Sequence, residues 1–166
     1  MVAAKRTKSA DRLSEALRSG VLRREYLAWL SGNLPAAARW RHFLEKNERT
    51  NVVRVVKGGG KEAILDVEPV AQGEYRGRAL TLARFRLETG RSHQIRVQAS
   101  FEGYPLLGDM KYGDRLPPEL RVFGRPALHS ALLEFPHPMT KELMRFEEEL
   151  PADMAGLVRV PGSDRE

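Results

Sequence analysis

The alternation of apolar and polar residues along this chain predicts a protein built mainly from β-strands. In residues 23–30 apolar side chains occupy both faces of the predicted strand, which indicates a strand well inside a sheet. Other short runs alternate between apolar and polar positions and are separated by turns containing glycine, proline or polar residues. The predicted strands are residues 23–30, 39–45, 51–57, 61–70, 79–88, 126–135 and 143–149, with residues 1–4 interpreted as the end of a further strand.

Two irregularities are expected within these strands. The strand over residues 61–70 is expected to end at Pro69, because proline cannot donate a hydrogen bond to a neighbouring strand. In residues 79–88 the apolar positions shift phase, which predicts a β-bulge near Ala83 and Arg84.

Helical periodicity is found in two segments. The first helix is expected to begin at Ser9, as its N-cap, and to end before Gly20, a residue type that favours the left-handed conformation after a helix. The second is expected to begin with Ser92 as its N-cap and to end at Gly103. Together these elements predict an α+β fold with a few helices and a largely antiparallel, mixed sheet.

Length and composition fit one globular domain. The chain has 166 residues, of which 42% are hydrophobic and 30% are charged, enough apolar material for a single core. We expect residues 1–152 to form the domain and residues 153–166 to form a polar tail.

Charge and the absence of cysteine narrow the functional classes. A formal net charge of +6 favours anionic partners, above all nucleic acid, although a basic surface without a partner would give the same total. The chain has no cysteine, which excludes disulfides, thiolate metal sites and cysteine nucleophiles. No apolar run reaches the length of a membrane span, so the expected location is the cytoplasm. The four histidines are scattered, and we predict neither a metal nor a cofactor.

Candidate chemistry is concentrated in residues 87–113, LETGRSHQIRVQASFEGYPLLGDMKYG. Arg91 precedes the predicted helix and Arg96 lies one turn into it, so both can act with free backbone N–H groups to hold a carboxylate or an RNA phosphate. The alternative interpretation is two solvated arginines beside a helix. His93 alone is typical of a structural hydrogen-bonding residue. Asp109 and Asp114 each follow a glycine, which is typical of turn-forming aspartates.

The motif TGRSHQIRV followed by GYPLLGDMKYG resembles the signature of the RluA-type RNA pseudouridine synthases. Three other stretches resemble that family in the same order. The stretch REYLAWLSG resembles its tyrosine-bearing strand, and GKEAILDVEPV resembles the strand before the arginine motif. The stretch ALHSALLEFPHPMTKELMRFEEELPADM resembles its C-terminal strand pair.

The resemblance implies cofactor-free isomerisation of uridine to pseudouridine in ribosomal or transfer RNA, on a nucleotide flipped out of its stack. In that family an aspartate is the nucleophile, a tyrosine lies against the base and is implicated in removing the carbon-5 proton, and an arginine forms an ion pair with the aspartate. Tyr26 matches this tyrosine and Arg96 matches the arginine. On this interpretation Arg91, Ser92, His93 and Gln94 are candidates for contacting the RNA or for supporting the catalytic side chains.

One part of the family pattern is missing. The nucleophilic aspartate belongs to a His-Arg-Leu-Asp segment that would fall shortly before Met1, and neither Asp11 nor Asp66 matches it. We therefore expect an N-terminally truncated catalytic domain that is inactive as this chain, with Arg96 lacking its carboxylate partner. A smaller departure is Gln98, where the family usually has histidine. The alternatives are a non-catalytic RNA-binding module of the same fold and a plain basic structural domain; the oligomeric state stays open.

Overall fold

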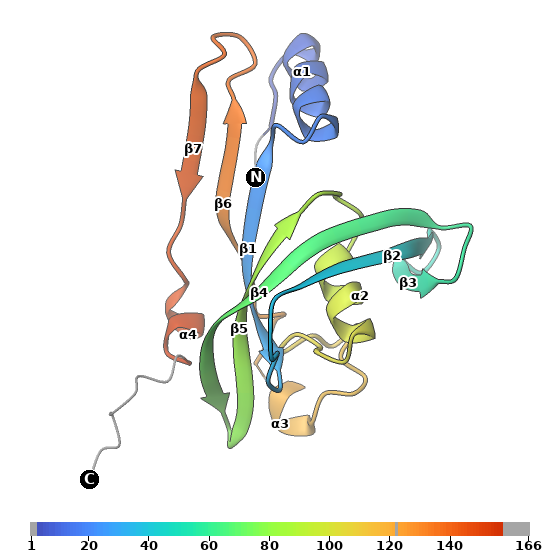
Figure 1. Cartoon of the computed structure of the whole chain (residues 1–166), viewed down its shortest axis with the longest axis vertical. Helices are drawn as coiled ribbons and strands as arrows, with labels where there is room; N and C mark the ends of the chain where they lie inside the picture. The colour runs from blue at the N-terminus through green and yellow to red at the C-terminus, as the bar shows by residue number, and fades with distance from the viewer. Residues whose placement is uncertain (1–2, 122, 158–166) are drawn as a thin grey trace.

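A single seven-stranded sheet runs through the molecule (Figure 1). The computed structural model describes residues 3–121 and 123–157. The strand order is β3-β2-β4-β5-β1-β6-β7, and every neighbouring pair in it is antiparallel, which confirms the α+β class with a largely antiparallel sheet. The strands are β1 (Arg23–Ser31), β2 (Ala38–Asn47), β3 (Val52–Val56), β4 (Lys61–Tyr75), β5 (Arg78–Leu87), β6 (Leu128–Pro136) and β7 (Leu143–Glu147).

Four helices accompany the described part of the sheet: α1 (Thr7–Arg18), α2 (Gln94–Phe101), α3 (Pro118–Arg121) and α4 (Ala152–Ala155). Figure 1 shows α1 beside the hairpin of β6 and β7, and α2 against the curved half of the sheet formed by β2, β3 and β4. The first helix begins three residues earlier than predicted: its N-cap is Arg6 and not Ser9, which lies in its first turn. Gly20 follows the helix with φ of +74°, as predicted.

The sheet buries apolar side chains on both faces. Ala28 and Leu30 of β1 join the cluster on one face, which α2 covers through Ile95 and Ala99. Trp29, between them in the chain, joins the cluster on the opposite face, together with side chains from α3, α4 and the segment before α3. The prediction that β1 lies inside the sheet with two apolar faces is therefore confirmed. It pairs with β5 on one side and β6 on the other.

The expected end of the fourth strand at Pro69 is wrong. Strand β4 continues to Tyr75, and its pairing with β5 shifts register between Pro69 and Ala71. Such a bulge accommodates a proline, which has no N–H group for the ladder. The predicted bulge near Ala83 therefore lies in the partner strand: Pro69 pairs with Ala83, while β5 pairs with β1 without interruption.

The two ends of the chain also differ from expectation. Residues 1–2 lie outside the described residues, and Ala3 and Ala4 are not in a strand. At the other end, the segment expected to be a polar tail, residues 153–166, begins inside α4, whose Met154 side chain is buried. The Trp29 indole Nε1–H donates to the Met154 carbonyl at 2.9 Å, so residues up to 157 belong to the fold. Residues 158–166 lie outside the described part.

Candidate functional site

The turn from β5 into α2 is held by the buried side chain of Gln94. Its Oε1 accepts hydrogen bonds from the Thr89 hydroxyl and the Arg91 backbone N–H, both at 2.9 Å. Its Nε2 donates to the Ile64 carbonyl of β4 at 3.1 Å. All three contacts are internal, so Gln94 supports the shape of this turn and does not face a ligand.

Position 93, and not Ser92, caps this helix. The N-cap residue is His93, in the left-handed conformation with φ of +53°, and no side chain caps the helix by a hydrogen bond. The prediction of Ser92 as the N-cap is wrong. Ser92 is exposed in the turn before His93. A left-handed residue other than glycine is uncommon, and asparagine, aspartate and histidine are the types that tolerate it best.

His93 is held by Tyr112, a residue that the sequence reasoning missed. The Nδ1 atom of His93 lies 2.6 Å from the Tyr112 hydroxyl, and the two rings meet edge to face. That hydroxyl accepts the Val53 N–H at 3.1 Å, so its own hydrogen is free to be donated to Nδ1. Burial, followed by the positive charges of Arg96 and Lys111, lowers the pKa of His93. The lowered pKa favours the neutral form of His93 at pH 7.

Arg96 has a carboxylate partner within the described residues, contrary to expectation. Its Nε and Nη2 donate to the two oxygens of Asp109, each at 2.7 Å, in a bidentate pair. The Asp109 side chain is only 1% exposed and that of Arg96 is 19% exposed. Burial, the largest influence on Asp109, opposes ionisation, but hydrogen bonds from Arg96 and the Tyr112 backbone outweigh it and lower the Asp109 pKa. The carboxylate is ionised and closed off, which does not suit a nucleophile.

Asp109 also forms the turn that its sequence context predicted. Its Oδ1 accepts the backbone N–H groups of Lys111 and Tyr112, each at 3.0 Å. Gly108 before it has φ of +73°, and a Cβ there would lie 2.1 Å from the Arg125 carbonyl oxygen. The motif spacing GDMKY thus brings one carboxylate to Arg96 and one tyrosine to His93. The Arg96 guanidinium lies 5.0 Å from the Tyr112 ring centroid, which joins the two pairs.

Tyr26 lies on β1, on the sheet face that α2 covers. Its partly buried ring packs against the cluster that contains Ala28 and Ile95. Among the described residues its hydroxyl has no hydrogen-bond partner, and no hydrogen bond or ring contact joins it to Arg96. The structure therefore brings the two predicted catalytic residues to one face of the sheet but not into direct contact.

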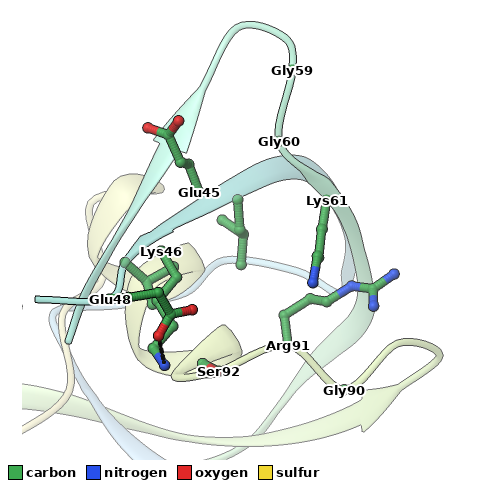
Figure 2. Close-up of a pocket in the computed structure, with 11 residues that line it drawn as sticks. Glu45, Lys46, Glu48, Gly59, Gly60, Lys61, Gly90, Arg91 and Ser92 are labelled. Atoms are coloured by element: carbon green, nitrogen blue, oxygen red, sulfur yellow. Dashed lines mark hydrogen bonds and ion pairs between the residues drawn. The ribbon is translucent and has the colours of Figure 1, made fainter.

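A polar hollow of about 390 Å³ lies next to the turn that carries Arg91 and Ser92. Figure 2 shows Lys61 and Arg91 on one side of it and the ion-paired Lys46 and Glu48 on another. The Arg91 Nε donates to the Glu62 carbonyl at 2.8 Å, which fixes the side chain at the rim. Lys61 makes no ion pair within the described residues. The hollow is lined by Leu44, Glu45, Lys46, Glu48, Val53, Gly59, Gly60, Lys61, Gly90, Arg91 and Ser92.

The Gly58–Gly60 loop between β3 and β4 contributes Gly59 and Gly60 to this hollow. Lys61 follows it directly and was not singled out from the sequence, because an isolated exposed lysine carries no spacing signal. Over residues 3–121 and 123–157, no group of three or more His, Cys, Asp or Glu side chains is placed to hold a metal ion. Within the same residues, no helix has both the length and the apolar character needed to cross a membrane.

Comparison with known proteins identifies the family. Residues 1–101 match the RNA pseudouridylate synthase family. The chain is 37% identical to ribosomal large subunit pseudouridine synthase D of Pseudomonas aeruginosa over 180 residues, and 34% identical to the uncharacterised RNA pseudouridine synthase YjbO of Bacillus subtilis over 163 residues. These alignments cover 100% and 96% of this chain but only 50% and 54% of the relatives, so the chain spans about half of their length.

Two solved structures share the fold. Human RNA pseudouridylate synthase domain containing 1 superposes with a TM-score of 0.75 at 23% identity, covering 88% of this chain and 62% of that protein. Human RNA pseudouridylate synthase domain containing 4 superposes with a TM-score of 0.68 at 18% identity, covering 90% of this chain and 66% of that protein. The sheet order, the arginine-bearing helix and these matches lead to one assignment: the chain belongs to the RNA pseudouridylate synthase family.

Proposed function

We propose that this chain is the C-terminal part of a pseudouridine synthase catalytic domain that takes ribosomal or transfer RNA as its partner in the cytoplasm. Ribosomal RNA is the favoured substrate, because several relatives bear the name ribosomal large subunit pseudouridine synthase D. The observation that carries the proposal is the placement of Tyr26: a partly buried ring, with a hydroxyl free of partners in the described residues, on the face covered by the Arg96 helix.

In the proposed reaction Tyr26 supplies two things. Its ring gives the flipped uracil an aromatic surface, an interaction worth roughly 1–3 kcal/mol per base. Its free hydroxyl can receive or pass the proton that leaves carbon 5 of the base. Arg96, with Asp109 behind it, supplies a fixed positive charge beside the place where a nucleophilic carboxylate has to stay ionised.

The hollow beside Arg91 is proposed to hold the RNA backbone. Lys61 and Arg91 present positive charge there, and Ser92 adds an exposed hydroxyl. Arg91→Gln combined with Lys61→Gln should weaken the binding of RNA and reduce its dependence on salt. Arg18→Gln combined with Arg78→Gln is the matched control, because both arginines are exposed and already paired, Arg18 with Glu15 at 2.6 Å and Arg78 with Glu119 at 3.5 Å.

Catalysis requires a nucleophile, and no carboxylate of the described residues is hydrogen-bonded to Tyr26. The carboxylate at Arg96 is the buried Asp109, which is engaged by four hydrogen bonds. We therefore predict that the purified 166-residue chain binds RNA but forms no pseudouridine. The assay is tritium release from ribosomal RNA transcribed with 5-tritiated uridine, with RNA binding measured on the same sample. Release of tritium would refute the predicted inactivity, and absence of RNA binding would refute the proposed function.

A second candidate is a non-catalytic RNA-binding module with the same fold. It is favoured by the internal Arg96–Asp109 pair, since an arginine already neutralised by the fold does not require a further carboxylate. The two candidate functions differ in whether Tyr26 contacts the uracil base. The catalytic candidate predicts that Tyr26→Leu reduces preference for a uridine-containing oligonucleotide over one with an abasic site. The module predicts that Tyr26→Leu leaves that preference unchanged.

A further inference from the structure

Arg24, on β1 two residues before Tyr26, lacks any partner for its charge among the described residues. It is partly buried, and its Nε atom is buried without a hydrogen-bond acceptor. Neither an ion pair nor a ring contact involves it within residues 3–121 and 123–157. The other described arginines that are partly buried all have a hydrogen-bond or ion-pair partner: Arg12, Arg84, Arg96, Arg121 and Arg125.

The carboxylates near Arg24 lie on the other face of the sheet. Side chains alternate along a strand, so Arg23 and Glu25 face one way while Arg24 and Tyr26 face the other. Glu25 lies 3.1 Å from Arg86, and Arg23 lies 3.5 Å from Glu134, so charges on that opposite face neutralise one another.

The guanidinium of Arg24 lies against the Thr-Gly-Arg turn. A Cβ atom built on Gly90 would be 2.8 Å from Nη1 of Arg24 and 3.1 Å from Nη2. The absence of a side chain at Gly90 therefore leaves the space that the guanidinium occupies. Arg24 and Tyr26 are about 7 Å apart along the strand, from a rise of roughly 3.4 Å per residue. Both side chains project from the same face of β1, so they can contact one nucleotide.

We propose that Arg24 binds the phosphate of the nucleotide whose base lies against Tyr26. The inference rests on the proposed function, because Tyr26 is the surface assigned to the base. A guanidinium is always charged and presents a planar set of donors that matches phosphate oxygens. The buried Nε, which has no acceptor, destabilises the free protein. The terminal Nη1 and Nη2 atoms, which lie against the exposed Gly90 and make no hydrogen bond within the described residues, are the donors that an RNA phosphate can reach.

The test compares Arg24→Gln with Arg23→Gln, two adjacent substitutions that remove the same charge from opposite faces of β1. The probe is a short single-stranded oligouridylate, and its affinity is measured by fluorescence anisotropy over a range of salt concentrations. Arg24→Gln should reduce the slope of log affinity against log salt by roughly 0.7, the value for one single-strand phosphate, and weaken binding about tenfold or more. Arg23→Gln should change neither quantity, because Arg23 is paired with Glu134.

Two further measurements separate this proposal from its alternatives. An oligouridine with uncharged methylphosphonate linkages should bind the wild-type chain more weakly than the charged oligonucleotide does. In Arg24→Gln the two oligonucleotides should differ less in affinity, because the arginine that binds the charged phosphate is absent. Thermal unfolding should show Arg24→Gln to be at least as stable as the wild type, whereas an arginine retained for the fold would lower the melting temperature when replaced.

Equal salt slopes and equal affinities for Arg24→Gln and Arg23→Gln would overturn the proposal. The proposed function can fail separately. In that case the wild-type chain binds a uridine-containing oligonucleotide no more tightly than one with an abasic site. Arg24→Gln would still reduce the slope of log affinity against log salt.

Discussion

The ion pair between Arg96 and Asp109 gives the sharpest test of how the motif in residues 87–113 supports the fold. Asp109→Asn removes the negative charge but keeps one oxygen, which can still accept the two backbone N–H groups of Lys111 and Tyr112. The new amide nitrogen then faces an Arg96 donor, so one hydrogen bond is lost and a partly buried guanidinium loses its counter-charge.

The expected magnitude follows from burial. Removing one partner of a buried pair costs about 3–5 kcal/mol, because the remaining charge is left uncompensated. The Asp109 side chain is only 1% exposed, so this is a buried pair. The Arg96 side chain is 19% exposed, and we therefore expect a loss at the lower end of the range, about 3 kcal/mol. A small domain unfolds with only about 5–15 kcal/mol, so the variant should still fold at 25 °C with much reduced stability.

Urea denaturation followed by circular dichroism measures this loss. The matched control is Asp66→Asn, because Asp66 binds Arg39 at 3.1 Å with side chains 49% and 53% exposed, and such a surface pair contributes about 0–1 kcal/mol. Arg96→Met and the double variant complete a cycle, in which the double variant should lose less stability than the sum of the single losses. If Asp109→Asn costs no more than Asp66→Asn, the assignment of Asp109 as a buried structural counter-charge is wrong.

Three further outcomes follow from the same site. The Asp109 pKa is lowered in the fold, so the stability that its charge confers should be complete above the unfolded-state pKa of about 3.9 and lost as pH falls through the folded-state pKa. In urea titrations at several pH values, the free energies of unfolding of the wild type and of Asp109→Asn should therefore become equal in acid. His93 should titrate below the ordinary histidine pKa of about 6.5 in an NMR experiment, so its neutral form is lost only in more acidic solution, and a value at or above 6.5 would contradict the burial argument. Gly108→Ala should destabilise the chain by roughly 3 kcal/mol or more, and Gly103→Ala by only about 1–2 kcal/mol. Both glycines have positive φ, but of the two only Gly108 faces a backbone oxygen. Equal melting temperatures for the two variants would refute this reasoning.

Strand content was predictable because it depends on local alternation. Residues 23–30 showed apolar side chains on both faces, and β1 lies in the interior of the sheet. The bulge was harder to assign, because it belongs to a pair of strands. The phase shift near Ala83 was visible in the sequence of β5, while the extra residue that causes it lies beside Pro69 in β4.

The candidate site was predictable only as far as its motif. Arg96 was recognised as a partner for a carboxylate, but the turn residue Asp109, thirteen positions later, was not recognised as that partner. A single sequence shows that Asp109 follows a glycine; it does not show that the turn folds back onto the α2 helix. Arg24 was missed for the same reason, since being unpaired is a property of the surrounding structure and leaves no mark in the local pattern.

The central place of β1 has a consequence for the order in which this protein folds. The strand nearest the N-terminus lies between β5 and β6, and Tyr26 pairs with Phe85 on one side and Ser130 on the other. Contacts between such distant positions close large loops, which makes folding slow relative to local helix formation. During synthesis, the edge of β1 that pairs with β5 stays unpaired until residue 87 has emerged, and the edge that pairs with β6 stays unpaired until residue 136 has emerged, so β1 is exposed to aggregation for much of that time. The surface assigned to the uridine base is thus assembled among the last parts of the molecule.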